Sequence, residues 1–293
     1  MKILITGGSG FLGRAILKRF QEQDIIRLGR SERCEIKCDI ARETPLISMQ
    51  PDYLIHAAGK AHMIPKTQEE ADAFFRVNTV GTERLLQALK GKSLKGIIFI
   101  STVAVYGLET GYMIDEDEPL SGQSPYALSK IQAEKLLEEY AHQNSVPLLI
   151  LRLPLLTGPD APGNFGAMVR AIQKGYYFRI GDGSARRSMV RAADVADALP
   201  SLLGRSGTYN LTDGHHPSVG ELDQVIARKL HRNIRALPMK WARLLARIGD
   251  RIPGSPFHTA RLDKLSNELI FTDAKARTDW GWSPHRVIDN LDI

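Results

Sequence analysis

The sequence predicts an α/β protein whose central element is a doubly wound parallel β-sheet. Short apolar runs typical of buried strands recur along the first half of the chain, and helical patterns alternate with them. This alternation favours a parallel sheet with right-handed crossovers. The first run, at residues 2–6, ends in a glycine-rich turn that leads into a helical pattern. After residue 156 the alternation becomes irregular, which predicts a smaller C-terminal region interleaved with the sheet.

The composition is that of an ordinary soluble globular protein, with 43% hydrophobic and 25% charged residues in a chain of 293. The formal net charge is +6, but the basic residues are scattered and form no long block. We therefore expect no nucleic-acid partner. A mild positive field is better suited to an anionic small molecule, such as a dinucleotide or a nucleotide sugar.

Two further features limit the class of protein. Cys34 and Cys38 have no second pair with which to complete a zinc site, so we expect no metal. The apolar run at the N-terminus is too short for a signal peptide, and no stretch approaches the ~18 apolar residues of a membrane span. These features predict a cytoplasmic location without a membrane partner.

The first strand, at residues 2–6, leads into a turn that contains four glycines and then into a helix. Strand, glycine turn and helix form the context in which a dinucleotide-binding fingerprint acts. The glycines permit a tight turn, a close approach of the backbone to a pyrophosphate, and close packing of helix on strand, while the helix N-terminus faces the phosphates. The candidate cofactor contacts here are Gly7, Gly10, Phe11, Leu12 and Gly13.

The second and third strands, at 25–28 and 35–40, bear on the identity of the dinucleotide. An NAD site usually has a carboxylate at the end of its second strand, where it binds the ribose 2′-hydroxyl. Arg30 occupies this region instead and is better matched to a 2′-phosphate, which favours NADP(H) over NAD(H), although the nearby Glu32 could reverse that preference. Asp39, with Ile40, is placed to contact the adenine, or Asp39 caps the next turn.

The fourth strand, at 53–59, ends in small residues over which a cofactor could lie, namely Ala57, Ala58 and Gly59. We interpret His56 as a packed strand-end histidine rather than an acid–base group. The long helical pattern over 67–90 contains Asn78, whose amide could buttress the loops at the strand ends. We count Asn78 among the candidate cofactor contacts.

The fifth strand, at 95–100, is followed directly by Ser101 and Thr102. In an open α/β sheet, ligands bind at the carboxyl ends of the strands, so both hydroxyls are candidate site groups. A further helix begins at Ser124-Pro125, where a capping hydroxyl precedes a proline in the first helical position. A sixth strand follows at 147–153.

Tyr126 and Lys130 lie four residues apart, on one face of that helix. A free phenol titrates near ~10 and a lysine near ~10.4, so neither transfers protons readily at neutral pH by itself. Opposite unit charges ~4 Å apart at an effective dielectric of ~20 gain at most about 4 kcal/mol. We therefore expect the ammonium of Lys130 to lower the pKa of Tyr126 by roughly 2–3 units. Lys130 has enough donors to hold a ribose hydroxyl as well.

The second half of the chain shows a long loop at 158–164, a short helix at 167–173, a strand at 207–211, and helices at 219–230 and 240–248. We predict a dinucleotide-binding domain at 1–156, to which a return strand near 207–212 belongs. Residues 157–293 are predicted to form mainly a substrate-binding region.

Several motifs, in this order, resemble those of the extended short-chain dehydrogenase/reductases, and in particular the nucleotide-sugar epimerase/dehydratase group with its Rossmann fold. They are the glycine turn at 6–13, His-Ala-Ala-Gly at 56–59, Val-Asn-Thr-Val-Gly-Thr at 77–82, Ser-Thr-Val-Ala-Val-Tyr-Gly at 101–107, and Tyr126 with Lys130. The resemblance extends from residue 1 to about 284.

The resemblance implies a role for each matching residue. Thr102 would bond the reacting oxygen, Tyr126 would act as acid and base while contacting the substrate, and Lys130 would bind the nicotinamide ribose. Asn164 and Arg187 would contact a substrate diphosphate, which suits the bidentate chemistry of arginine. The family also implies a homodimer formed by the helices at 67–90 and 126–142.

The resemblance further implies chemistry at C4 of a UDP-(N-acetyl)hexose, by a 4-epimerase or a 4-keto-sugar reductase of surface polysaccharide biosynthesis. The Asp-Glu pair that dehydratases need is replaced by Val103-Ala104, which argues against 4,6-dehydration. Two alternatives remain open: a reductase of a non-nucleotide carbonyl compound, and a non-catalytic regulator that senses a dinucleotide.

Overall fold

The structure is a computed structural model that describes residues 1–61, 63–252 and 258–293, with the side chains of residues 260 and 261 outside the description. Its centre is a seven-stranded parallel sheet in the order β11-β7-β5-β4-β1-β2-β3. The strands are β1 (Ile3–Thr6), β2 (Ile25–Gly29), β3 (Ile36–Lys37), β4 (Tyr53–His56), β5 (Gly96–Thr102), β7 (Leu148–Leu153) and β11 (Gly207–Asn210). The predicted doubly wound α/β fold is confirmed.

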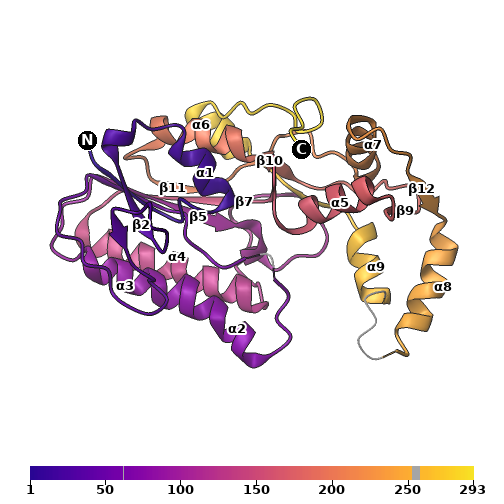
Figure 1. The fold of residues 1–293 in the computed structure, drawn as a ribbon, viewed down its shortest axis with the longest axis horizontal. Helices are drawn as coiled ribbons and strands as arrows, with labels where there is room; N and C mark the ends of the chain where they lie inside the picture. The colour runs from indigo at the N-terminus through magenta and orange to yellow at the C-terminus, as the bar shows by residue number, and fades with distance from the viewer. Residues whose placement is uncertain (62, 253–257) are drawn as a thin grey trace.

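Helices cover both faces of this sheet (Figure 1). On one face lie α1 (Phe11–Leu17), α6 (Ala192–Leu202) and α10 (Ala274–Trp280), and on the other lie α2 (Gln68–Phe75), α3 (Gly81–Ala88) and α4 (Pro125–Asn144). Because neither face meets water, the central strands are mostly apolar, and every residue of β1 is buried. The chain order reverses between β1 and β4, which is where ligands bind in sheets of this kind.

Two predicted helices show details that matter for the site. The helix expected over 67–90 is continuous but contains one π-helical turn, η2 (Arg76–Val80), between α2 and α3. Such turns are rare and occur frequently at functional sites. Helix α4 begins as predicted, because Ser124 Oγ accepts a hydrogen bond of 3.1 Å from the backbone N–H of Ala127 and Pro125 occupies the first turn.

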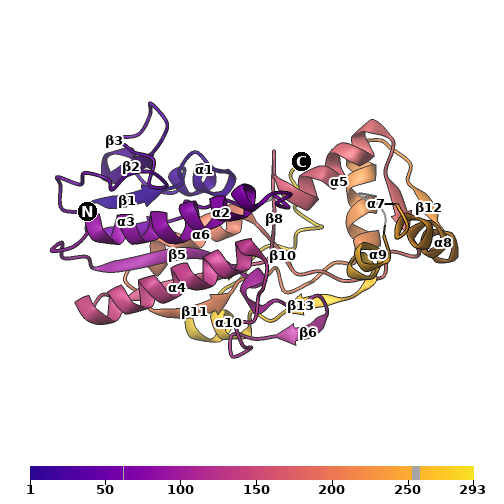
Figure 2. The same ribbon diagram turned by 90° about the horizontal axis from the view of Figure 1, so that it is seen from below.

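The second half of the chain contributes to two parts of the molecule. A smaller lobe, to the right in Figures 1 and 2, contains α5 (Gly163–Lys174), β9 (Phe178–Ile180), α7 (Val219–Lys229), β12 (Arg235–Leu237), α8 (Met239–Gly249) and α9 (Thr259–Ser266). In contrast, α6, β11 and α10 return to the large sheet. The C-terminal region is therefore interleaved with the sheet, whereas the proposed boundary at residue 156 stays a prediction.

Several short elements were not predicted. Parallel pairs are formed by β8 (Leu155–Thr157) with β10 (Met189–Arg191), β6 (Gly111–Ile114) with β13 (Leu269–Phe271), and β12 with β9. Helices α6, α9 and α10 were missed as well. Strands of three or four residues are too short to show a period of two, and only the pairing partner stabilises them. Short single-turn helices lie at Glu22–Asp24 and Val103–Tyr106.

Two classes of feature are absent from the part of the chain that the structure describes. None of its helices combines the length and the apolar character needed to cross a bilayer. In the same residues, no group of three or more His, Cys, Asp or Glu side chains is arranged to hold a metal ion.

Candidate active site

The glycine turn between β1 and α1 is enforced by packing at two of its positions. Gly7 has a φ of +74°, and a Cβ there would lie 2.5 Å from the backbone of Ala57 and Ala58. A Cβ on Gly13 would lie 2.0 Å from the carbonyl oxygen of Gly7. Any side chain at Gly7 or Gly13 would therefore push α1 or the end of β4 away from the turn.

Gly10 differs from these two glycines. A Cβ there would meet only the carbonyl oxygen of Gly7, at 3.1 Å, so packing demands glycine much less strictly than at Gly7 or Gly13. Gly10 is also the N-cap residue of α1, and no side chain caps that helix end. The free N–H groups and the space above Gly10 fit the close approach of a pyrophosphate. The turn therefore fits a dinucleotide.

At the end of β2, Arg30 is exposed. Glu32, the residue that could have opposed a 2′-phosphate, is paired with Lys37 in an ion pair. Asp39 accepts a hydrogen bond of 3.1 Å from the N–H of Ala41, so it caps the turn after β3, one of its two predicted roles. It remains half-buried at the same sheet edge as the glycine turn. Ile40, by contrast, is buried and packs against α3 at Gly81.

His56, the last residue of β4, is buried as the sequence predicts. Its Nδ1 lies 2.6 Å from Thr6 Oγ1 and its Nε2 lies 2.9 Å from Thr82 Oγ1. Burial, aided by the charge of Lys130, lowers the pKa of His56 to about 3. The imidazole is therefore neutral at physiological pH, and it ties the ends of β1, β4 and α3 together rather than exchanging protons with a ligand.

Asn78, in the π-helical turn, buttresses the loop that follows β4. Its side-chain oxygen accepts from the N–H of Lys60 at 2.7 Å, and its nitrogen donates to the carbonyl of Lys60 at 3.1 Å and to Ser129 Oγ at 2.9 Å. The side chain is buried. Its polar atoms bind protein groups, so Asn78 acts by positioning the strand-end loop and α4.

Thr102 and Tyr126 come together at the carboxyl end of β5. A hydrogen bond from Thr102 favours the phenolate of Tyr126, but burial opposes it more strongly, so the pKa of Tyr126 is raised above its ordinary value. Phe74 packs against the phenol ring, with ring centroids 5.9 Å apart. Tyr126 is therefore a neutral phenol at physiological pH, held beside a hydroxyl.

Lys130 does not lower the pKa of Tyr126, which corrects the sequence expectation. Its Nζ donates a 2.6 Å hydrogen bond to the carbonyl of Ile100 and lies 3.8 Å from the ring centroid of Phe99. Burial lowers the pKa of Lys130 from 10.5 to about 7, although Glu134 opposes the shift. The four-residue spacing placed both residues on one face of α4, but it could not show that both would be desolvated there.

A buried charged network lies behind Lys130 and was not predicted. Glu134 forms an ion pair of 2.8 Å with Arg152 of β7, and Ser101 Oγ donates to Glu134. Arg152 also donates to the hydroxyl of Tyr106 at 3.1 Å. The hydroxyl of Ser101 is therefore bound to Glu134, in contrast to the expectation that it faces a ligand. Two signals could have revealed the pair: Glu134 lies four residues after Lys130, and Arg152 interrupts an apolar strand.

Asn164 and Arg187 lie apart from this cluster. Asn164 is exposed in the first turn of α5. The guanidinium of Arg187 donates to the backbone carbonyls of Lys264 and Asn267, at the C-terminal end of α9, and burial lowers its pKa. The structure thus places Arg187 between the end of α9 and β13, where it forms a β-bridge with Leu269.

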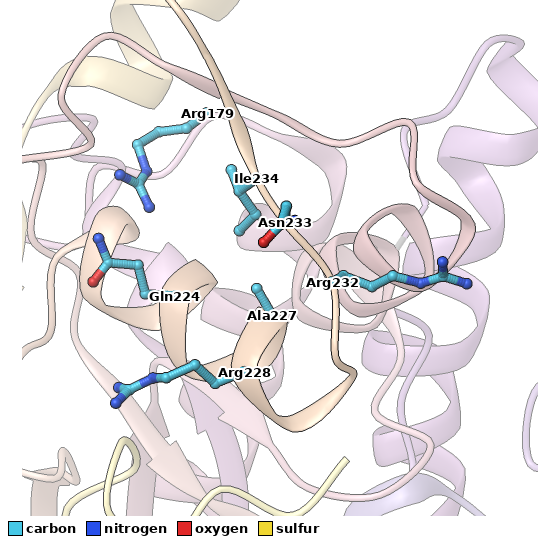
Figure 3. A pocket seen from close by; sticks show the side chains of 7 residues that line it. All are labelled: Arg179, Gln224, Ala227, Arg228, Arg232, Asn233 and Ile234. Carbon is cyan, nitrogen blue, oxygen red and sulfur yellow. The ribbon is translucent and has the colours of Figure 1, made fainter.

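A hollow in the smaller lobe has several basic residues but does not form a convergent anion site (Figure 3). It lies between α7 and β12, and its cationic lining residues are Arg179, Arg228 and Arg232. The side chains of Arg228 and Arg232 point in opposite directions. Arg179 is already neutralised by Asp223. We therefore assign the functional site to the carboxyl edge of the large sheet.

Comparison with known proteins agrees with this assignment. Residues 3–211 match the NAD dependent epimerase/dehydratase family. The chain is 25% identical over 307 residues to a UDP-glucose 4-epimerase of Vibrio cholerae, a match that covers 98% of this chain and 92% of the relative.

Two solved structures have the same fold. RMD from Pseudomonas aeruginosa, complexed with NADPH, is 22% identical with a TM-score of 0.75, covering 99% of this chain and 96% of that one. The UDP-glucose 4-epimerase of Thermus thermophilus, in complex with NAD, is 22% identical with a TM-score of 0.73, covering 97% and 94%.

Proposed function

The chain belongs to the NAD dependent epimerase/dehydratase family, and from this premise we propose that it is an NAD(P)-dependent enzyme acting at C4 of a UDP-(N-acetyl)hexose. The membership bears out the family resemblance of the sequence motifs. The observation that carries the proposal is the contact of Thr102 with Tyr126 one helical turn before the buried Lys130, at the edge where the glycine turn lies. The reaction is a 4-epimerisation or the reduction of a 4-keto sugar in surface polysaccharide synthesis.

The nicotinamide dinucleotide would be held at the carboxyl edge of the sheet. Gly10 would accommodate its pyrophosphate at the N-terminus of α1, in a turn whose shape depends on Gly7 and Gly13, and Lys130 would bind the nicotinamide ribose. The bound cofactor supplies the group that accepts and donates hydride. Arg30 supports NADP(H), because it is exposed at the end of β2 while Glu32 is paired with Lys37.

Tyr126 moves the proton at O4 of the sugar. A phenol whose pKa is raised is protonated at neutral pH, and it can donate to the oxygen of a 4-keto group as that oxygen gains negative charge. Thr102 orients the same oxygen through its hydroxyl. In the opposite direction, Tyr126 must first lose its proton, which requires a nearby positive charge. An epimerase uses both directions in each turnover, whereas a reductase uses only the first. The exposed Arg30 supports the reductase, because a cofactor exchanged at every turnover is drawn from the NADPH pool.

The diphosphate of the substrate is assigned to Asn164 and Arg187. Asn164 lies on the smaller lobe, in the first turn of α5, and Arg187 forms a β-bridge with Leu269 of β13. Arg187 combines a fixed guanidinium with partial burial, conditions under which an anion is bound strongly. The helices α2, α3 and α4, which pack together on one face of the sheet, are proposed to form a homodimer.

One experiment separates these readings: purify the protein, identify the nucleotide that accompanies it, and add UDP-GlcNAc. We expect a protein without tightly held NAD that oxidises NADPH only when a 4-keto sugar is present. Tightly held NAD together with formation of UDP-GalNAc would establish the epimerase instead. Failure to bind any UDP-sugar would reject both readings and favour a reductase of another carbonyl compound. Dinucleotide binding without turnover of any tested substrate would favour a regulator.

A further inference from the structure

Helix α8 (Met239–Gly249) is amphipathic in an unusual sense. The residues that it buries are small, namely Ala242, Ala246 and Gly249. Its large apolar side chains face outward, and with Ile252 just after the helix they form a stripe in which each residue is between 47% and 56% exposed: Trp241, Leu244, Leu245, Ile248 and Ile252. A helix whose only task is to pack against its own protein buries its large apolar residues instead. We therefore expect this outward stripe to be covered by a binding partner.

Basic residues flank this stripe. An α-helix rotates by ~100° per residue, so the large apolar residues of the stripe within α8 span an arc of about 100°. The small buried residues lie to one side of this arc, and the basic residues lie to its other side. The basic residues, including one just after the helix, are Lys240, Arg243, Arg247 and Arg251. All four are exposed, and none forms an ion pair with a residue that the structure describes. Asp250, at the C-terminal end of the helix, is bound by Thr259 and interacts electrostatically with Arg251.

The position of α8 leaves the stripe accessible. The helix lies at the end of the smaller lobe, remote from the strands β1, β2 and β3 (Figures 1 and 2). Its inner side packs with Leu262 of α9 and with Leu237 and Met239 in a small cluster of its own. This places α8 at one extremity of the molecule, where a flat surface could reach it without obstruction by the large sheet.

We propose that α8 docks this protein peripherally on an anionic lipid bilayer. A helix that has Trp and Leu on one face and Lys and Arg beside them, with no acidic residue within it, matches the interface between acyl chains and negatively charged headgroups. Charge complementarity selects this occupant, because neither a second copy of this cationic helix nor an uncharged apolar partner would neutralise the four cations. The expectation of no membrane partner rests on the lack of a spanning segment and does not address docking of this kind.

The test is co-sedimentation of the full chain with vesicles. We expect binding to phosphatidylcholine vesicles that contain about 30% phosphatidylglycerol, weakening as salt is raised, and little binding to phosphatidylcholine alone. Each cation near such a surface contributes about fivefold in affinity, so Arg243→Gln with Arg247→Gln should weaken binding at least about tenfold. Leu244→Ser with Ile248→Ser should weaken it to a similar extent, because the apolar contact is lost.

Matched controls separate the stripe from overall composition. Arg228→Gln with Arg232→Gln removes the same net charge from the hollow between α7 and β12 in the same lobe. Leu46→Ser removes an apolar side chain elsewhere that is 87% exposed. Both should leave vesicle binding within about twofold of the parent. Equal loss in the charge control would mean that net charge alone attracts the protein, and would overturn the proposal.

The unaltered protein provides a second readout in case a variant fails to fold. Of the three tryptophans, Trp280 and Trp282 pack against each other on the core of the large sheet, whereas Trp241 is exposed on α8. Brominated lipids in anionic vesicles should therefore quench the fluorescence of Trp241. An absence of quenching or of vesicle binding would overturn the proposal. So would light scattering that shows a larger oligomer for the parent than for the α8 variants, because the stripe would then bind a second copy of the chain.

Discussion

Replacement of Lys130 by methionine should stabilise the ligand-free protein while removing a group that the proposed reaction needs. Lys130 is buried, and the structure lowers its pKa from 10.5 to about 7. Methionine fills a similar volume and favours the helix equally well. The variant thus removes a desolvated charge without leaving a large cavity, so charge burial should dominate the outcome.

The size of the effect follows from the pKa. A fall from 10.5 to about 7 means that burial costs the protonated lysine about 5 kcal/mol. The carbonyl of Ile100 loses its donor in the variant, which costs about 2 kcal/mol. Lys130→Met should therefore be more stable than the parent by about 3 kcal/mol at pH 6.

The sign of the pH dependence provides the sharper test. The folded-state pKa lies below the unfolded value, so between about pH 7 and pH 10.5 the unfolded chain binds more protons than the folded one. The stability of the parent must then rise with pH across this window, and the penalty is fully present below about pH 7. From pH 6 to pH 9 the advantage of Lys130→Met should shrink by about 3 kcal/mol.

Urea unfolding of parent and variant at pH 6 and pH 9, followed by tryptophan fluorescence, measures this double difference. Lys135→Met serves as the matched control, because Lys135 is an exposed lysine on the same helix. A free-energy difference that is the same at both pH values within about 0.5 kcal/mol would refute the claim that Lys130 is a desolvated cation. So would a variant less stable than the parent at pH 6.

Three further results are expected. Tyr126→Phe should reduce kcat by about 10²–10⁴-fold in a steady-state assay, while the Kd of the UDP-sugar measured by calorimetry stays within a few-fold of the parent value. Unchanged turnover would show that Tyr126 takes no part in the reaction. Gly13→Ala, whose Cβ would lie 2.0 Å from a backbone oxygen, should lose about 3 kcal/mol or more of stability in urea. Gly10→Ala, whose Cβ would lie 3.1 Å from one, should lose far less stability in the same assay but should lose dinucleotide affinity, and equal losses of stability would contradict this reasoning. Arg30→Ala should raise the KM for NADPH at least about tenfold and leave that for NADH nearly unchanged, and a parallel rise in both would show that Arg30 does not select the 2′-phosphate.

Much of the fold could be predicted from the sequence, because the patterns that determine its main strands, its first turn and the start of α4 are local. The apolar runs at 2–6, 53–59 and 147–153 became central strands, since a buried parallel strand is apolar on both faces. Gly7 and Gly13 marked the first turn, where their backbones leave no room for a Cβ. Ser124 and Pro125 marked the start of the helix that carries Tyr126. Each of these signals lies within a few residues of the structure that it determines.

Other features depended on contacts between distant segments. The ion pair of Glu134 with Arg152 joins a helix to a strand, and the short strands β6 and β13 exist only as partners of one another. Asn78 was predicted as a buttress, but its specific partners, Lys60 and Ser129, are supplied by other elements. No local period contains such information, because it arises from the pairing of segments that are remote in the chain.

The sequence alone determined that Tyr126 and Lys130 share one face of a helix, because a spacing of four residues has that effect whatever surrounds them. Only the tertiary structure decided their charge states, because a pKa depends on the water that the surrounding groups exclude. The same holds for α8, whose sequence determines that the small, the large apolar and the basic residues form three separate sectors around the helix. Which sector faces water was decided by the packing of Ala242 and Ala246 against α9 and β12.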